Sequence, residues 1–361
     1  MSEFDLIRRH FTRATPNALL GVGDDAALLQ VSEGNVLAVS SDMLVSGTHF
    51  FADADPYLLG HKTLAVNLSD MAAMGALPRW ATLALALPYK NTVSVNDPSP
   101  TPTLPRWERE KSEVVVDDVW LEQFSAGFFA LAQQHGVELV GGDTTRGPLN
   151  LCVTIMGEVP QGKALRRDGA QVGDEVWVSG TLGDAALGLA HLQAKIVLPE
   201  DTRIHCLAAL HQPAPRVALG LALRGVATSA IDISDGLLSD LGHILERSQV
   251  GAEVDFSLLP TSDVLRSFSL SPNLSPACGR EERDSAGERS FMQHCILSGG
   301  DDYELCFTAP ATSHAEILSL STKLNFPLTR IGSIVTGQGC IVRDAAGKSL
   351  SIESTGYDHF R

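Results

Sequence analysis

Several features that identify common protein classes are missing from this sequence of 361 residues. Basic residues are scarce: Lys and Arg total 27 against 43 Asp and Glu, which gives a formal net charge of −16. Such a chain lacks the concentrated positive charge with which proteins hold a nucleic-acid backbone. We therefore expect no nucleic-acid partner, and an anionic substrate would need bound cations to offset the acidic field.

Long apolar segments are also missing. No stretch approaches the roughly 18 uninterrupted apolar residues of a membrane-spanning helix, and the opening MSEFDLIRRHFTRAT has no signal-peptide core. We therefore expect a cytoplasmic protein with no membrane partner. The six cysteines form no C-x-x-C pair, so we expect reduced, mostly buried thiols rather than disulfides.

The familiar nucleotide-binding motifs do not occur either. The sequence has no G-x-x-x-x-G-K-[ST], no H-R-D or D-F-G set, and no G-x-G-x-x-G after a strand. Any ATP site here is therefore not a P-loop. One glycine-containing turn, Ser179–Gly183 (SGTLG), could contact phosphate, but a plain strand-to-helix turn is the more common interpretation of this pattern.

The length favours two domains, because a single core rarely grows to this size. The first part mixes short strands with helices, and after a Gly-containing basic segment at Val159–Gly173 a new strand and helix follow. The expected strands are Val36–Ser40, Ala81–Leu87, Leu151–Ile155 and Glu175–Ser179, and the expected helices are Pro56–Ala73, Val119–His135 and Asp184–Gln193. We predict an α+β or α/β domain over residues 1–159 and a second domain over residues 160–361.

Two stretches, about residues 91–116 and 269–290, are rich in Pro, Ser and charge and have no apolar period. This composition is typical of solvated surface loops, so we interpret both as inserts. A partner-binding role is the less favoured alternative.

One chemical theme recurs along the chain: a short β-like run ends in a Gly- or Ser-rich turn that contains Asp. It is found at Gly21–Ala27, Ser40–Met43, Asn67–Gly75, Gly141–Gly147, Ile231–Leu237 and Ser298–Leu305. Taken singly, each is explained by a turn or a helix cap. Asp70 precedes the small residues Met71–Met74, and Asp235 precedes an expected helix at Gly236–Arg247.

Taken together, these turns indicate a metal site. Converging carboxylates repel one another unless cations neutralise them, and oxygen ligands without His or Cys select hard cations such as Mg²⁺. Magnesium is commonly held by one or two carboxylates together with substrate phosphates. The Gly141–Gly142 and Gly299–Gly300 pairs fit this interpretation, since residues without Cβ let backbone N–H groups approach phosphate oxygens.

The order and spacing of these motifs resemble the thiamine-monophosphate kinase family from about residue 4 to residue 360. The motifs are GVGDDAAL, SSDMLVSGTHF, KTLAVNLSDMAAMGA, GGDTTRGP, LRRDGAQVGDE, AIDISDGLLSDL, SGGDDYELCFT and GYDHF. The resemblance extends to the superfamily of aminoimidazole-ribonucleotide synthetase and selenophosphate synthetase. It implies an N-terminal α+β domain that dimerises through its strands, a C-terminal α/β domain, an ATP site between them, and a homodimer.

The resemblance also implies residue roles. Metal ligands, direct or through water, are expected at Asp25, Ser40, Ser41, Asp42, Asp70, Asp143, Asp232 and Asp235. Nucleotide contacts are expected at Gly142, Asp143, Arg167 and Ser234, and thiamine-phosphate contacts at His49, Asp301 and Tyr357. Among these, Asp42, Asp70, Asp143, Asp232 and Arg167 are the expected catalytic residues. Gly-Gly-Asp-Asp replaces the Gly-Gly-Glu-Asp of many relatives, so the sequence leaves Asp301, Asp302 and Glu304 open as the substrate contact.

The implied reaction is Mg²⁺-dependent transfer of the ATP γ-phosphoryl group to thiamine monophosphate. An ionised acceptor phosphate needs no general base, so direct in-line transfer is expected. Two alternatives stay open: another ATP-using enzyme of the superfamily, and a non-catalytic Mg²⁺–nucleotide-binding protein. Against the first, selenophosphate synthetases need an N-terminal reactive Cys, and the first cysteine here is Cys152.

Overall fold

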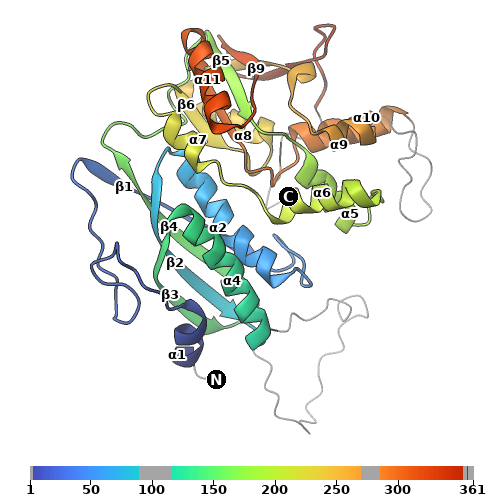
Figure 1. Ribbon diagram of the computed structural model, residues 1–361. Helices are drawn as coiled ribbons and strands as arrows, with labels where there is room; N and C mark the ends of the chain where they lie inside the picture. The colour runs from blue at the N-terminus through green and yellow to red at the C-terminus, as the bar shows by residue number, and fades with distance from the viewer. Residues whose placement is uncertain (1–2, 89–115, 270–284, 353–355, 357–361) are drawn as a thin grey trace. The chain divides into compact units, whose positions relative to one another are not determined.

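The computed structural model describes residues 3–88, 116–269, 285–352 and 356 (Figure 1). Most of both expected inserts, and the aromatic position Tyr357, lie outside these residues. The chain forms two compact units, which are described separately below. The first comprises residues 1–32, 39–67 and 78–157, and the second comprises 33–38, 68–77 and 158–361.

A four-stranded sheet with the order β1-β4-β2-β3 forms the framework of the first unit (Figure 1). Its strands are β1 (Asn35–Val45), β2 (Leu77–Leu87), β3 (Glu138–Arg146) and β4 (Asn150–Pro160), with helices α2 (Pro56–Ala73) and α4 (Asp118–His135) between them in sequence. Short helical turns, α1 (Glu3–Leu6) and η1 (Ile7–Phe11), begin the chain. All three expected strands and both expected helices of this region are present.

The two helices of the first unit pack closely because glycines stand at their contact. A Cβ at Gly60 would lie 2.0 Å from the carbonyl oxygen of Phe124, and one at Gly127 would lie 1.9 Å from that of Tyr57. Burial alternates along the strands: Leu151, Val153 and Ile155 of β4 are fully buried, whereas the residues between them are only partly buried. This alternation gives the sheet one covered face and one open face.

A six-stranded mixed sheet with the order β10-β7-β9-β5-β8-β6 forms the framework of the second unit. Its strands are β5 (Asp174–Ser179), β6 (Ser229–Asp232), β7 (Gly251–Asp255), β8 (Leu305–Pro310), β9 (Leu328–Val335) and β10 (Gly339–Arg343). Its helices are α5 (Asp184–Leu192), α6 (Glu200–His211), α7 (Val217–Ala222), α8 (Leu237–Ser248), α9 (Asp263–Ser269), α10 (Ser285–Leu297) and α11 (His314–Leu324), with short turns η2 (Phe256–Leu258) and η3 (Ala311–Ser313). One apolar core joins this sheet to α5, α6, α8, α9 and α10.

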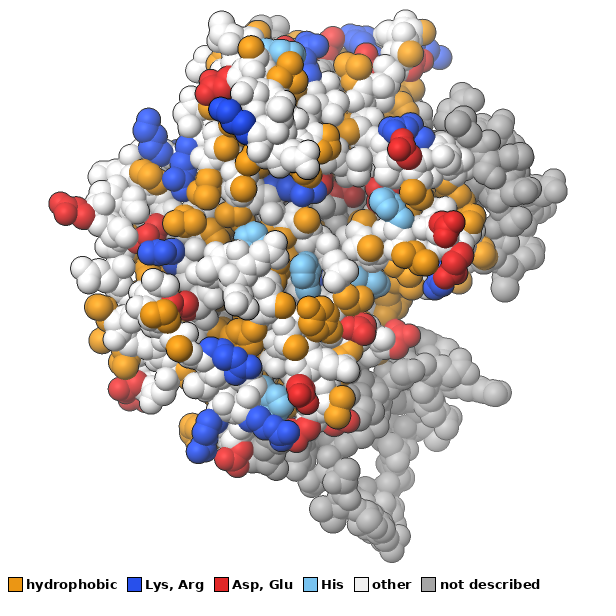
Figure 2. Space-filling view, in the orientation of Figure 1, with side chains coloured by type: hydrophobic (Ala, Val, Ile, Leu, Met, Phe, Trp, Pro, Cys, Tyr) orange, Lys and Arg blue, Asp and Glu red, His pale blue; other side chains and the backbone are white. Residues whose placement is uncertain are grey.

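Within the described residues, no helix combines the length and apolar character needed to cross a membrane. The five cysteines of these residues are free thiols, of which Cys206, Cys295 and Cys306 are buried. On the face shown in Figure 2, Lys and Arg side chains are interspersed with acidic ones, and the described residues form no continuous basic patch there.

Candidate functional site

Two acidic residues of the second unit, Asp70 and Asp232, lie near the end of strand β6. Asp232 is the last residue of β6, is 5% exposed, and accepts a hydrogen bond of 2.8 Å from the Ser69 hydroxyl near the end of α2. Burial and the nearby Asp70 carboxylate raise the pKa of Asp232 above its ordinary value, while Arg167 acts in the opposite direction. Asp70 and Arg167, two of the expected site residues, therefore both influence the pKa of Asp232.

Asp70 and Asp235 are not helix caps, contrary to the simplest explanation of their motifs. Asp70 lies inside α2 rather than before a new helix, because the small residues that follow it extend the same helix. Asp235 precedes α8, whose N-cap is Gly236 with no side-chain capping bond. Helix capping therefore does not explain either carboxylate.

Asp240, which is not among the expected site residues, holds the loop after Asp232. Asp240, in the first turn of α8, accepts hydrogen bonds from the backbone N–H groups of Ser234, Asp235 and Gly236 at 3.0, 3.1 and 3.1 Å. Burial, Asp232 and Asp235 raise the pKa of Asp240 to about 7. The sequence signal was available: Ser239-Asp240 repeats the Ser234-Asp235 pair of the same motif five residues further on.

Two adjacent arginines have different surroundings. Arg166 makes an exposed, bidentate pair with Asp168 at 2.8 and 2.6 Å. Arg167 instead contributes to the electrostatic environment of Asp232, and its carbonyl oxygen is held by the Ser248 hydroxyl at 2.8 Å. Of the two arginines, Arg167 is therefore the one that lowers the pKa of Asp232.

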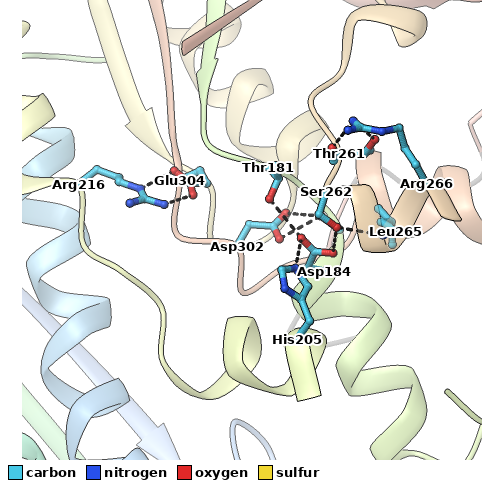
Figure 3. Close-up of polar contacts among 11 residues, drawn as sticks. Thr181, Asp184, His205, Arg216, Thr261, Ser262, Leu265, Arg266, Asp302 and Glu304 are labelled. Carbon is cyan, nitrogen blue, oxygen red and sulfur yellow. Dashed lines mark hydrogen bonds and ion pairs between the residues drawn. The ribbon is translucent and has the colours of Figure 1, made fainter. Parts of the chain in front are cut away.

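The structure separates the three acids of the motif Gly300–Leu305. Asp302 accepts hydrogen bonds from the N–H of Gly183 at 3.1 and 3.2 Å, and burial raises its pKa well above the ordinary value (Figure 3). Glu304 forms a bidentate ion pair with Arg216 and accepts a hydrogen bond of 2.6 Å from Ser179. Asp301 is only partly buried, and its N–H donates to the Ser234 carbonyl oxygen at 2.9 Å, which places it beside the 232–236 loop.

The glycine-containing turn at 179–183 is a structural turn. The N–H of Gly183, at the start of α5, is occupied by Asp302, and the adjacent Asp184 accepts hydrogen bonds from Thr181 and Ser262 (Figure 3). A helix N-terminus attracts anions, but here the chain's own carboxylates fill that position. The interpretation as a plain turn is therefore favoured over phosphate binding.

In the first unit, the predicted ligands of strand β1 lie on two faces. The Ser41 hydroxyl donates to the Val153 carbonyl oxygen at 3.1 Å and lies 3.0 Å from the Thr154 hydroxyl, on the open side of the sheet. Side chains alternate along a strand, so Ser40 and Asp42 face the covered side. The backbone N–H of Asp42 is held by Asn67 of α2 at 3.3 Å.

The Gly142–Asp143 pair lies on the edge strand β3. Gly142 has φ of 151°, and a Cβ there would lie 1.9 Å from the Leu83 carbonyl oxygen, so this position requires glycine. Asp143 pairs with Ala84 of β2 and is exposed. A Cβ at Gly141, two residues earlier, would contact the Thr82 methyl group, which places Asp143 on the open face with Thr82 and Ala84.

The remaining predicted residues of the first unit lie outside the sheet. Asp25 is exposed on the loop 21–27, which is bounded by a bridge between Leu20 and Leu28. His49 follows β1, and its Nδ1 accepts a hydrogen bond of 3.0 Å from the backbone N–H of Val45. The ring proton of neutral His49 is therefore on Nε2.

No three His, Cys, Asp or Glu side chains of the described residues already form a metal-binding group. The chemistry of the Asp70–Asp232 pair nevertheless fits a hard divalent cation, because a bound cation would offset both the burial and the repulsion that raise the pKa of Asp232.

Comparison with known proteins places these features in a family. Residues 23–159 match the model of the AIR synthase related protein N-terminal domain, and residues 171–345 match that of the C-terminal domain. The thiamine-monophosphate kinase of Escherichia coli strain K12 is 43% identical to the chain, over 99% of the chain and 98% of its own length. That of Bacillus subtilis is 30% identical, over 100% of both chains.

Solved structures of similar proteins support the same family. The thiamine-monophosphate kinase from Stenotrophomonas maltophilia K279a is 45% identical over 96% of each chain, with a TM-score of 0.75. A structure described as AaThiL complexed with AMPPCP and TMP is 27% identical over 99% of this chain and 96% of its own, with a TM-score of 0.70. The hydrogenase maturation protein HypE, 19% identical with a TM-score of 0.68, shares the fold alone. With both domains matched and full-length relatives this similar, the chain belongs to the thiamine-monophosphate kinase family of AIR synthase related proteins.

Proposed function

We propose that this protein transfers the γ-phosphoryl group of ATP to thiamine monophosphate, giving thiamine diphosphate and ADP, with Mg²⁺ as the metal and the cytoplasm as its location. The observation that carries the proposal is the buried Asp232 facing Asp70, with Arg167 beside them. Two adjacent carboxylates in a poorly solvated position are costly to the fold, and a bound cation with its phosphate ligands would offset that cost.

The proposed metal ligands are those that the family resemblance implies. They are Asp25, Ser40, Asp42, Asp70, Asp143, Asp232 and Asp235, with Ser41 contributing through its peptide oxygen because its hydroxyl is bonded across the open face. Gly142, Asp143, Arg167 and Ser234 are the proposed nucleotide contacts. When bound, Mg²⁺ would neutralise phosphate charge during transfer.

The chain's own residues would then position and screen the two anionic substrates. Arg167 supplies a positive charge where the acceptor and the γ-phosphoryl group repel each other. The acceptor phosphate, whose second pKa is about 6, is already ionised at neutral pH, so no side chain has to remove a proton. Direct in-line transfer follows.

Asp301 and His49 are the proposed contacts to thiamine monophosphate in the described residues. Of the three acids left open by the sequence, Asp301 is proposed because its N–H donates to the Ser234 carbonyl oxygen at 2.9 Å, which places it beside the loop 232–236. Neutral His49 can offer an Nε2–H to an acceptor oxygen. Tyr357, expected to stack on the thiamine rings, remains a proposal from the resemblance.

A coupled assay of ADP release with thiamine monophosphate, compared with a blank lacking the acceptor, tests the function. Acceptor-dependent ADP release is expected. Binding of Mg²⁺–ATP without acceptor-dependent turnover would instead favour a non-catalytic nucleotide-binding protein. Rapid quench with γ-labelled ATP tests direct transfer, and label trapped on the protein would contradict it.

The adjacent arginines provide a matched pair of variants. Arg167→Ala is expected to lower kcat/KM by about tenfold to a hundredfold, because a charge-assisted contact to phosphate is lost. Arg166→Ala should leave activity nearly unchanged, because its exposed pair with Asp168 contributes little. Equal losses in the two variants would contradict the assignment of Arg167.

We also propose a homodimer in which the open sheet face is the interface. Val39 and Met43 of β1 are 58% and 52% exposed on this face, which is an unusual position for apolar side chains of a strand. Asp143 lies on this open face and Asp42 on the covered one, on the two edge strands of the sheet. A single nucleotide site that uses both is most simply built from Asp42 of one protomer and Asp143 of its partner.

Co-expression of Asp42→Asn with Asp143→Asn distinguishes a site shared between two protomers from a site built within one protomer. Each variant alone should be inactive. If the residues act in different protomers, random pairing restores one site in each mixed dimer and about a quarter of wild-type activity. No restoration would place both residues in one protomer's site.

A further inference from the structure

The loop between β6 and α8 contains an occupied anion-binding site. Three consecutive backbone N–H groups, those of Ser234, Asp235 and Gly236, converge on one oxygen, Oδ2 of Asp240. Successive N–H groups that face one point form a concavity that binds anions, and a helix N-terminus strengthens the effect. Here the anion is a side chain of the helix itself, and Asp240 is only 3% exposed.

This arrangement determines which groups the loop can offer to a ligand. Because the N–H groups turn inward to Asp240, they are not available to a phosphate at this helix N-terminus. The loop's carboxylates, Asp232 and Asp235, flank the same turn. The loop is therefore suited to a cation rather than an anion, although its glycine and its position before a helix are typical of phosphate-binding turns.

The carbonyl side of the same loop is tied to the loop that carries Asp301. The Ser234 carbonyl oxygen accepts from the N–H of Asp301 at 2.9 Å, and the Ile233 carbonyl oxygen accepts from that of Tyr303 at 2.8 Å. Asp301 and Tyr303 both have positive φ, 68° and 49°, which non-glycine residues rarely adopt without support from their surroundings. A shift of Ser234 would therefore also move Asp301.

We propose that Asp240 is a positioning residue for the phosphoryl transfer, holding the metal-binding loop 232–236 directly and Asp301 through it. The inference rests on the ligand set of the proposed function. Asp240 acts through the hydrogen bonds that it accepts, and it is not itself a metal ligand.

The test compares Asp240→Ala with Asp240→Asn, because the Asn oxygen can accept the same N–H groups without the charge. In Asp240→Ala, kcat/KM for ATP and for thiamine monophosphate should both fall by about tenfold to a hundredfold, the range found when a group that orients metal ligands is removed. Asp240→Asn should stay within about threefold of the wild type.

Asp344 provides the matched control. Its carboxylate accepts hydrogen bonds from the N–H groups of Ala346 and Lys348 at 3.0 and 2.9 Å, in a turn after β10. Asp344→Ala should lower the melting temperature without changing the kinetic constants. This control separates positioning of the site from general support of a turn.

A second measurement does not depend on turnover. The melting temperature is recorded with and without Mg²⁺ and AMPPCP, and the ligand-induced rise should be reduced in Asp240→Ala and retained in Asp240→Asn. No rise in the wild type would count against the proposed ligand set rather than against Asp240.

Two outcomes would overturn the inference. Equal losses in Asp240→Asn and Asp240→Ala would show that the charge acts, as in a metal ligand. Unchanged kinetic constants and an unchanged ligand-induced shift in Asp240→Ala, with only a lower melting temperature, would show a structural role alone. If Asp240→Ala does not fold, Asp240→Asn still decides: a loss beyond tenfold contradicts positioning by hydrogen bonds.

Discussion

Two loops of the second unit look alike in sequence but differ in what their acids do. In the loop 300–304, Asp302 is bonded to a backbone N–H and Glu304 to a guanidinium group. In the loop 232–236, Asp232 receives one hydroxyl hydrogen bond and faces another carboxylate, Asp70. Two acids of the first loop are therefore bonded within the fold, whereas the acids of the second loop are the ones that we propose as metal ligands.

The two loops differ in whether neighbouring groups oppose the effect of burial on the pKa of a carboxyl group. Burial raises the pKa of Glu304, but Arg216 and Ser179 oppose the shift. For Asp232 the second-largest cause is repulsion from Asp70, which acts in the same direction as burial. A carboxylate that the protein itself destabilises in this way is a candidate for function.

The largest expected effect is on turnover. Asp232→Asn should reduce kcat by at least about a hundredfold, because a proposed metal ligand is lost. The same change removes a repelled charge, so the melting temperature without Mg²⁺ should rise slightly. Kinetics and metal-free thermal unfolding measure both effects. Full activity of Asp232→Asn at limiting Mg²⁺ would show that Asp232 is not a metal ligand, and the proposed difference between the two loops would be wrong.

The opposite result is expected for Glu304. Glu304→Gln leaves the Arg216 cation partly buried without its counter-charge, which should cost about 3–5 kcal/mol of unfolding free energy. Glu253→Gln, in the more exposed pair with Arg343, is the control and should cost far less. Urea unfolding of both variants tests this. Equal losses of unfolding free energy in Glu304→Gln and Glu253→Gln would mean that the Glu304–Arg216 pair does not contribute more to stability than the exposed pair.

The pH dependence of stability sharpens the comparison further. Because the folded-state pKa of Asp302 is raised above 3.8, the folded protein keeps a proton that the unfolded chain has already released. The unfolding free energy therefore falls as the pH rises from about 4 through the raised pKa. Asp302→Asn should weaken this fall without removing it, since the pKa of Glu304 is raised too.

Urea unfolding between pH 5 and pH 8 is the measurement. Relative to the wild type, Asp302→Asn should be more stable at the higher pH than at the lower. A constant difference across this range would show that Asp302 keeps its proton, or lacks it, at every pH measured.

Local patterns predicted much of this molecule, and contacts between distant segments account for what was missed. Helix α2 was predicted with its exact bounds, because its apolar spacing and initial Pro56 are local signals. The Glu304–Arg216 pair joins residues 88 positions apart, which no local pattern records. Asp240 is only four residues from Gly236, but its role depends on the inward turn of three N–H groups.

The face of β1 on which each side chain lies is predictable from strand alternation. Strand alternation alone separates Ser41 from Ser40 and Asp42 once β1 is known to be a strand. The sequence expectation named Ser40 and Ser41 as metal ligands without specifying an atom, and the alternation bears only on the face on which each hydroxyl lies.

The smallest expected effect concerns these two serines and extends the comparison to the first unit. The Ser41 hydroxyl is already used by the fold, through Val153 and Thr154, whereas Ser40 lies on the face of Asp42. Ser40→Ala should raise the Mg²⁺ concentration for half-maximal activity by a few fold, roughly the contribution of one neutral ligand or hydrogen bond. Ser41→Ala should leave that concentration nearly unchanged, because only its peptide oxygen is available to a metal. Titration of activity with Mg²⁺ at saturating ATP measures both variants. A larger shift for Ser41→Ala would mean that the hydroxyl leaves Thr154 when the metal binds, and that groups bonded within the fold are not excluded from the site.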